Sequence, residues 1–220
     1  MKVLATDYDD TLATGGVIAE ETIAALQQFR ARGNEVILVT GRILEDFFRV
    51  CPHHFFLDRI VAENGAVFYD VRTQKSELLC ESFSRSSLLK LRSMGIQDLD
   101  FGRVMVSTSR PYMKVLQQWM DESEDKIQVI SNRESLMILP SGIDKLTGLT
   151  QVLDRMNVSL TEVIGMGDAE NDLSFLSQCG ESIAVQNAID AVKKIATHIT
   201  LARAGEGVVE FLNHYLALPS

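Results

Sequence analysis

The stretch Lys2–Thr11, KVLATDYDDT, decides how the rest of the chain is interpreted. Its apolar first half predicts a short buried strand over Lys2–Thr6. The strand ends in the acidic segment Asp7–Thr11. Because ligands of an open α/β sheet bind just beyond the carboxyl ends of the strands, a functional site is expected at this segment.

Strand and helix patterns alternate along the segments that follow. Apolar residues at helical spacing predict helices over Glu20–Arg32 and Ile43–Val50, and continuous apolar runs predict strands over Glu35–Val39 and Arg59–Ala62. Consecutive βαβ units of this kind build a parallel sheet. The alternation resumes after Gly142, with the following predicted helices and strands: Lys145–Arg155, Glu162–Met166, Glu170–Gln178, Ser182–Val185, Ala188–Ala196, His198–Thr200 and Gly205–Leu218.

The segment between these two parts, residues 67–141, has a different rhythm. It begins with a hairpin-like pair of short strands, Ala66–Asp70 with Ser76–Cys80, and continues with short helices and a second hairpin. We therefore predict an α/β fold. A doubly wound parallel sheet is formed by residues 1–66 and 142–220, and it is interrupted by an inserted small α+β domain over residues 67–141.

The composition argues against several classes of protein. Hydrophobic residues make up 46% of the 220 residues, so the chain can bury a substantial core. The formal charge of −9 argues against a duplex nucleic-acid binder, which carries a basic surface. No apolar run approaches the ~20 residues that span a bilayer, and the early acidic segment does not fit a signal peptide. We expect a cytoplasmic protein with neither nucleic acid nor membrane as a partner, and with Cys51, Cys80 and Cys179 as reduced thiols.

Polar residues follow each strand in the middle of the predicted sheet. The segments that do so are Thr40–Arg42, Glu63–Gly65 and Gly167–Asp172. The carboxylates expected to meet at this edge of the sheet are Asp7, Asp9, Asp168 and Asp172. Since like charges at close range repel one another, a divalent cation is expected among them, and Mg²⁺ prefers such oxygen ligands.

These residue types can support phosphoryl transfer. A carboxylate of the first loop can act as the nucleophile, and its neighbour two residues on can act as a general acid and then a base. The Thr40 hydroxyl and the Lys145 ammonium group can hold a phosphoryl group. Each feature alone has an ordinary structural explanation, because acids cap helices and surface cations are solvated. Their succession at neighbouring strand ends favours a site.

With these motifs in this order, the chain resembles the haloacid dehalogenase superfamily of phosphohydrolases, and most closely its Cof-type branch. The motifs that carry the resemblance are DxDxT at Asp7–Thr11, Thr40 within VILVTGR, Lys145 within GIDKLTGL, GMGDAEND with Asp168 and Asp172, and the shorter signatures AENGA and AVQNA. The resemblance covers residues 1–66 and 142–220.

The resemblance implies a role for each motif residue. Asp7 would attack the phosphorus and become an aspartyl-phosphate, and Asp9 would protonate the leaving alcohol and then activate water. Mg²⁺ would be held by Asp7, the backbone carbonyl of Asp9 and Asp168, with Asp172 in the outer shell. The residues implied to bind phosphate are Thr40, Gly41, Lys145 and Asn171, and the candidate substrate contacts are Arg42 and Asn64.

The resemblance further implies a Mg²⁺-dependent phosphatase for a small phosphorylated metabolite, such as a sugar phosphate or phosphoglycolate. The inserted domain would be the cap that selects the leaving group. Asp10 stands where a glycine is usual in this family. Arg103, Arg110 and Arg133 are cationic candidates for binding a second anionic group of the substrate. The oligomeric state is left open.

Three alternatives differ in chemistry. A phosphomutase of the phosphomannomutase type shares DxDxT and this kind of cap, but it requires a bisphosphate. A phospho-accepting regulatory protein of the receiver type would carry its aspartate after the third strand, where this chain has Glu63-Asn64-Gly65. A dinucleotide-binding module would need a third glycine after Gly165-Met166-Gly167.

Overall fold

The larger part of the protein is an eight-stranded sheet with the strand order β12-β11-β10-β1-β2-β3-β4-β5. The computed structural model describes residues 1–217. The strands from β12 to β3 run parallel, and β4 and β5 continue the sheet as an antiparallel hairpin. The strands are β1 (Val3–Thr6), β2 (Glu35–Val39), β3 (Arg59–Ala62), β4 (Val67–Asp70), β5 (Lys75–Leu78), β10 (Val163–Gly167), β11 (Glu181–Ala184) and β12 (His198–Ile199).

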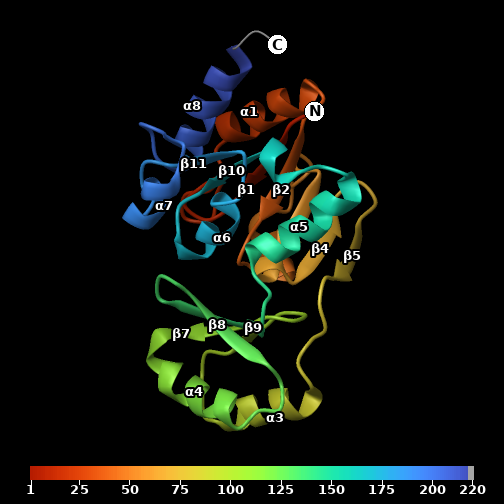
Figure 1. Ribbon diagram of the computed structural model, residues 1–220, viewed down its shortest axis with the longest axis vertical. Coiled ribbons are helices and arrows are strands. Elements are labelled where there is room, and N and C mark those ends of the chain that lie inside the picture. Colours follow the sequence, from red (N-terminus) through yellow and green to blue (C-terminus); the bar gives the residue numbers. More distant parts are fainter. Residues whose placement is uncertain (218–220) are drawn as a thin grey trace.

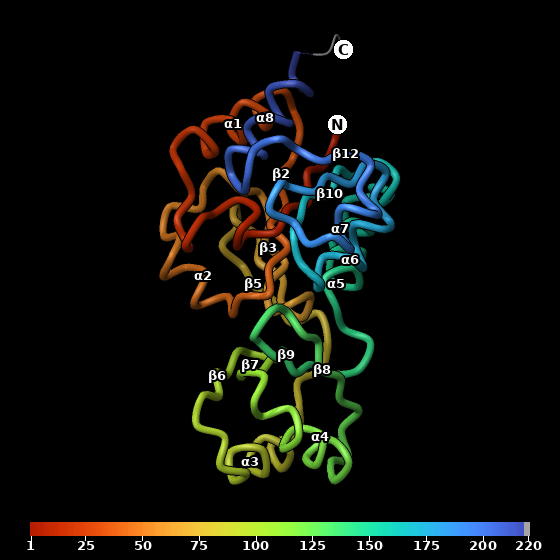
Figure 2. Tube along the Cα trace, turned by 90° about the vertical axis from the view of Figure 1, so that its left-hand side faces the viewer, coloured from red at the N-terminus to blue at the C-terminus, as the bar shows by residue number. Residues whose placement is uncertain are grey.

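Helices cover both faces of this sheet, as a doubly wound fold requires. Figures 1 and 2 show α1 and α8 packed together on one side, and α5, α6 and α7 on the other. Because β1 is covered on both faces, every residue of this strand is buried. The helices of this part are α1 (Glu20–Ala31), α2 (Leu44–Val50), α5 (Lys145–Met156), α6 (Leu173–Leu176), α7 (Asp190–Ile195) and α8 (Ala204–Ala217).

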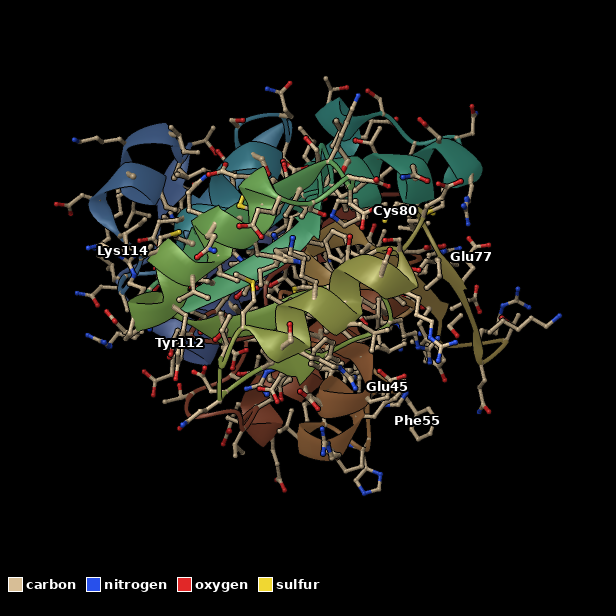
Figure 3. The ribbon with its side chains drawn as sticks, turned by 90° about the horizontal axis from the view of Figure 1, so that it is seen from below. Glu45, Phe55, Glu77, Cys80, Tyr112 and Lys114 are labelled. Carbon is tan, nitrogen blue, oxygen red and sulfur yellow. The ribbon has the colours of Figure 1, made fainter. Side chains whose placement is uncertain are left out.

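A second, four-stranded antiparallel sheet has the order β6-β7-β9-β8 and carries two helices. We call this part, residues 85–140, the small module. Figure 1 places it below the main sheet, and Figure 3, which looks from below, shows its helices on the outer side. Its elements are α3 (Arg85–Ser93), β6 (Asp100–Phe101), β7 (Val106–Ser109), α4 (Met113–Asp121), β8 (Ile127–Asn132) and β9 (Ser135–Pro140).

The small module has a hydrophobic cluster of its own. Along β9, side chains alternate between two environments, as the period of two in a strand dictates. Leu136 and Ile138 pack in the cluster of the module with Trp119, whereas Met137 and Leu139 pack in the core of the main sheet. One face of the small sheet therefore closes over its own helices, and the other faces the main part of the protein.

The observed sheet differs from the prediction at the first hairpin. Residues 67–80 were expected in the inserted domain of residues 67–141, but β4 pairs with β3 and extends the main sheet. An isolated two-stranded hairpin is marginally stable in water, so joining the open edge of an existing sheet stabilises it. The predicted helix Glu170–Gln178 is shorter, because it begins as a 3₁₀ turn over Glu170–Asp172 and α6 ends at Leu176.

The C-terminal end of the predictions reaches past the described residues. Leu218, the last residue of the predicted closing helix, and residues 218–220 of the predicted core lie outside them. Within residues 1–217, the helices are all too short or too polar to cross a membrane.

Candidate active site

The carboxyl end of β1 delivers Asp7 to the point where the main sheet faces the small module. The backbone N–H of Asp7 donates to the Met166 carbonyl (3.0 Å), which continues the pairing of β1 with β10. The loop that follows β10 brings two more acids to the same place. Carboxylate oxygens of Asp7, Asp168 and Asp172 lie within 4.8 Å of one another, and all three residues are buried. These three carboxylates form what we call the acidic cluster.

Lys145 enters the acidic cluster from the first turn of α5. Asp144 caps the start of this helix: its carboxylate accepts from the Thr147 N–H, while the Thr147 hydroxyl accepts from the Asp144 N–H. This capping box fixes the start of the helix, and hence the position of Lys145. The ammonium group of Lys145 contacts Asp7 and lies 2.6 Å from Asp172 Oδ1. Burial opposes its charge, but Asp172 and Asp7 outweigh that effect and raise the pKa of Lys145, so the side chain is positively charged.

Burial makes two acids of this cluster, Asp7 and Asp168, resist ionisation. Burial raises the pKa of Asp7 well above its usual range, and Asp172 and Asp168 add to that shift against the opposing effect of Lys145. Burial and the neighbouring Asp172 raise the pKa of Asp168 to about 6. A cluster of hard oxygen donors with excess negative charge fits a divalent cation, and Mg²⁺ prefers this kind of ligand.

Neighbouring groups orient the two acids of the β10 loop. The Thr11 hydroxyl donates to Asp168 Oδ1 (3.0 Å). Asp172 Oδ2 accepts from the backbone N–H groups of Asp168 (2.9 Å) and Ala169 (3.0 Å). Asp172 therefore braces the loop with one oxygen and contacts Lys145 with the other.

Asp9 lies apart from the acidic cluster. Its two carboxylate oxygens accept from Nε and Nη2 of Arg42, each at 2.7 Å, in a bidentate pair. Four carboxylates were expected to cluster here, but the structure brings three together, because the carboxylate of Asp9 pairs with Arg42 instead. Asp9 and Asp7 nevertheless line the same cavity.

The loop after β2 and the turn after β3 pack against each other beside Asp7. Thr40 is buried, and its hydroxyl accepts from the Arg42 N–H (3.1 Å). A Cβ added to Gly41 would lie 2.5 Å from Met137 Cε and 3.3 Å from Asn171 Nδ2, so the backbone here closely approaches both side chains. Asn171 donates to Asn64 Oδ1 (3.1 Å), and the buried Nδ2 of Asn64 has no hydrogen-bond partner among the described residues.

A cavity of about 480 Å³ lies between the acidic residues and the small module. Its lining residues from the main part include Asp7, Asp9, Gly41, Arg42, Ile43 and Asp46, and those from the small module include Met105, Ser107, Asn132, Arg133, Ser135 and Met137. Of the lining residues in the small module, only Arg133 was a candidate from the sequence. The polar turn between β8 and β9 was the one sequence feature that could have indicated Asn132–Ser135 as part of the site.

Of the three candidate arginines in the inserted segment, Arg133 reaches the cavity. It donates to Asp168 Oδ2 (2.7 Å) and also contacts Asp10. Arg103 instead pairs with Glu45 and Ser76, and Arg110 donates to the carbonyl of Arg133. Asp10 has a φ of 60°, a left-handed conformation that glycine adopts without steric cost.

The fold and this site together define a class of hydrolase with a Rossmann-like core and an inserted module over the strand ends. Comparison with protein families agrees: the family model described as haloacid dehalogenase-like hydrolase matches residues 4–93 and 74–212. The chain belongs to this family. Within the family it is a phosphatase.

Two curated relatives and one solved structure illustrate the similarity. The chain is 40% identical over 264 residues to the 5-amino-6-(5-phospho-D-ribitylamino)uracil phosphatase YitU of Bacillus subtilis, with 98% of each chain covered. It is 26% identical over 224 residues to the phosphoglycolate phosphatase of Methanothermobacter thermautotrophicus, covering 98% of this chain and 99% of the relative. A haloacid dehalogenase-like hydrolase from Bacteroides thetaiotaomicron has the same fold, with a TM-score of 0.82 at 20% identity over 97% of this chain and 99% of the other.

Proposed function

We propose that the chain is a Mg²⁺-dependent phosphatase that hydrolyses a monoester of a small phosphorylated metabolite through an aspartyl-phosphate intermediate. The observation that carries the proposal is the buried contact between Asp7 and Lys145 at the end of β1, where a cavity opens toward the small module. A carboxylate so placed can attack phosphorus while a fixed cation lies beside the developing charge.

In this mechanism Asp7 forms a bond to phosphorus as the bond to the leaving oxygen breaks. Asp9 gives its proton to that oxygen and later takes a proton from the water that hydrolyses the aspartyl-phosphate. Arg42 orients Asp9 through the bidentate pair. The groups proposed to hold the phosphoryl oxygens are Thr40, the Gly41 N–H, Lys145 and Asn171, with Arg42 and Asn64 as further candidate substrate contacts.

The residues proposed to hold Mg²⁺ are Asp7, the backbone carbonyl of Asp9 and Asp168, with Asp172 behind them. Bound there, the ion would neutralise negative charge on the carboxylates and the phosphoryl group. Thr11 holds the Asp168 carboxylate through a hydrogen bond to Oδ1, and Asp172 holds the backbone of the same residue by accepting from its N–H.

We further propose that the small module acts as the cap that selects the leaving group, with β4 and β5 belonging to the core. Arg133 and Arg42 both line the cavity, and they favour a substrate with polar or anionic groups besides the phosphate. Phosphoglycolate, sugar phosphates and phosphorylated sugar alcohols share these properties. Two curated relatives are named as phosphatases of such compounds, one of phosphoglycolate and the other of 5-amino-6-(5-phospho-D-ribitylamino)uracil. We also propose that the enzyme is cytoplasmic and that it binds neither nucleic acid nor a membrane.

Phosphate release from a panel of substrates tests this function. The panel contains phosphoglycolate, sugar phosphates, the phosphorylated ribitylaminouracil and nucleotides, each assayed with Mg²⁺ and with a chelator. We expect Mg²⁺-dependent release from at least one small metabolite, with no need for an added bisphosphate. Turnover that requires a bisphosphate and yields an isomer would instead identify a phosphomutase, and full activity in chelator would contradict the role of the metal.

A further inference from the structure

Glu63 is a buried carboxylate of the main part that has no role in the proposed mechanism. It follows β3 directly and is 0% exposed. Its Oε1 accepts from the backbone N–H of Arg103 (2.9 Å), and its Oε2 accepts from those of Val104 (2.8 Å) and Met105 (2.9 Å). Three successive N–H groups of the small module thus converge on one carboxylate of the main part.

Both partners are shaped for this contact. A Cβ added to Gly102 would lie 2.6 Å from the Glu63 carboxyl carbon and from its Oε2, so only glycine leaves room for the carboxylate. Glu63 itself has a φ of 51°, in the left-handed region that a side-chain-bearing residue adopts at an energetic cost. The Gly102 N–H donates to the Met105 carbonyl (2.8 Å), which closes the loop around the carboxylate.

This contact lies between the loop Thr40–Arg42, which contains two of the residues proposed to bind phosphate, and the wall of the cavity. On the side of the main part, the Glu63 N–H donates to the Arg42 carbonyl (2.9 Å), and the N–H of its neighbour Asn64 donates to the Thr40 carbonyl (3.0 Å). On the side of the small module, Met105 lines the cavity directly, and the next strand, β7, pairs with β9. A displacement of the loop at Glu63 would therefore move the cavity wall relative to Asp7.

We propose that Glu63 is a positioning residue that docks the small module onto the main part and so sets the distance between the cavity wall and Asp7. Its kinetic consequence rests on the phosphatase function proposed above. Hydrogen bonds to a charged acceptor are stronger than neutral ones, and a buried carboxylate that loses its donors is destabilised. Both effects favour the docked arrangement over an open one.

An ion pair made by the side chain of Arg103, on the same loop, provides a matched control. Arg103 Nε lies 2.8 Å from Glu45 Oε1, but the two side chains are 37% and 51% exposed. Figure 3 shows Glu45 at the surface of the protein. Exposed pairs contribute little to stability, so Glu45→Gln should leave the docking unchanged although it removes a charge from the same interface.

Hydrogen exchange of the full-length protein tests the docking itself. Glu63→Gln keeps the shape of the side chain but replaces one acceptor oxygen with a donor. Gly102→Ala leaves Glu63 intact and disturbs the contact from the other side. We expect the Arg103–Met105 amides to exchange about tenfold faster in both variants, and at the wild-type rate in Glu45→Gln. Amides of the β8–β9 ladder should keep their protection. Unchanged exchange at Arg103–Met105 in a folded Glu63→Gln or Gly102→Ala protein would overturn the proposal.

Steady-state kinetics test the consequence for the site. If the docked state becomes a minor population, KM for a substrate that touches the small module rises about tenfold while kcat changes less than about twofold, because saturating substrate restores docking. KM for a small aryl phosphate that makes no such contact should stay at the wild-type value. Faster exchange with equal effects on both substrates would overturn the positioning role. If the wild-type protein hydrolyses no phosphate ester, the proposed function fails, and the exchange data still decide whether Glu63 docks the module.

Discussion

Asp7 and Asp9 are two residues apart, yet they differ in every property that decides a chemical role. Asp7 is buried against Lys145, whereas the Asp9 side chain is 45% exposed and paired with Arg42. A buried carboxylate beside a fixed cation suits the nucleophile, and a carboxylate nearer to solvent can exchange protons with water. The structure thus supports different assignments for the two acids.

The substitution Asp7→Asn should abolish turnover, because a neutral amide cannot form an acyl phosphate. The fold should survive: burial disfavours the charge of Asp7 (its pKa is raised), so the melting temperature in metal-free buffer near neutral pH should not fall. Phosphate release and thermal unfolding measure the two effects. Appreciable turnover in Asp7→Asn would exclude the covalent mechanism through this residue.

The substitution Asp9→Asn should be less severe with an activated substrate. The nucleophile remains, but proton transfer is lost at a typical cost of ~10²–10⁴ in rate. An aryl phosphate needs little protonation of its leaving group, so rapid mixing should reveal a burst of phenol before a slow steady state. The absence of a burst, together with a larger loss than in Asp7→Asn, would require the two roles to be exchanged.

The stabilisation by Mg²⁺ should depend on pH. The pKa of Asp168 is raised to about 6, so below that value a proton competes with the metal for this carboxylate. We expect Mg²⁺ to raise the melting temperature clearly at about pH 7.5 and only slightly at about pH 5, because binding to the native state stabilises it by mass action and requires the ionised ligand. Asp168→Asn is the control, and it should show no shift at either pH. An equal shift at both pH values would argue against metal binding by Asp168.

The sequence could locate the acids but not their pairing. Asp7, Asp168, Asp172 and Lys145 could be predicted to converge because strand ends of a parallel sheet share one edge. The pairing of Asp9 with Arg42 depends on side-chain rotamers, which no spacing in the sequence fixes. Likewise, the approach of Arg133 to Asp168 depends on how the β8–β9 hairpin lies over the main sheet.

At the scale of elements, the packing of α5 against the turn after β3 sets the position of Lys145. Gly148 of α5 faces Gly65, and a Cβ added to Gly148 would overlap the Gly65 backbone. Gly65 has a φ of 108° and itself leaves no room for a Cβ against the Asp144 carbonyl. Two glycines thus allow a close approach of the helix and the turn.

The substitution Gly148→Ala should destabilise the protein although alanine is the better helix former. Overpacking costs about 1–3 kcal/mol, which exceeds the gain of about 1 kcal/mol in helix propensity. Activity should fall as well, because α5 carries Lys145. Urea unfolding measures the change, and Asp154→Ala on the exposed side of α5 should stay within about 0.5 kcal/mol of the wild type. A stabilised Gly148→Ala protein would show that the helix can shift freely.

The sequence predicted the parallel strands of the main sheet, but it did not predict that the hairpin β4–β5 extends this sheet at one edge. Continuous apolar runs identified β1, β2, β3 and β10 with nearly their observed bounds. The hairpin β4–β5 has the same short-strand pattern as β8–β9, and local sequence does not say which sheet a hairpin joins. The two-residue strand β6 is too short to leave any periodic pattern.

At the scale of the whole molecule, the two hydrophobic clusters predict unfolding in more than one step. Trp119 is the single tryptophan of the chain and is buried in the cluster of the small module, where its indole N–H donates to the Ser87 carbonyl (3.0 Å). Its fluorescence therefore reports on the module, whereas far-UV circular dichroism reports on the whole chain.

We expect the fluorescence transition in urea to occur at a lower concentration than the transition in circular dichroism. A small unit buries a smaller fraction of its surface, so it has less stability of its own. Trp119→Phe should remove the early optical signal and serves as the control for the probe. Coincident transitions would indicate that the two parts unfold as one cooperative unit.

The contact at Glu63 also limits how this protein can exchange its small module for another one. The chain passes between the main part and the small module at residues 79–84 and 141–144, which would be the natural junctions for a graft. A module taken from another protein and joined there would bring its own loop in place of Gly102–Met105. Unless that loop presents N–H groups at the same place, the buried Glu63 carboxylate loses its donors, at a cost of about 1–3 kcal/mol or more for an unsatisfied buried acceptor. Core and module are therefore compatible only as a matched pair, and a working chimera must inherit residue 63 and its receiving loop from the same parent.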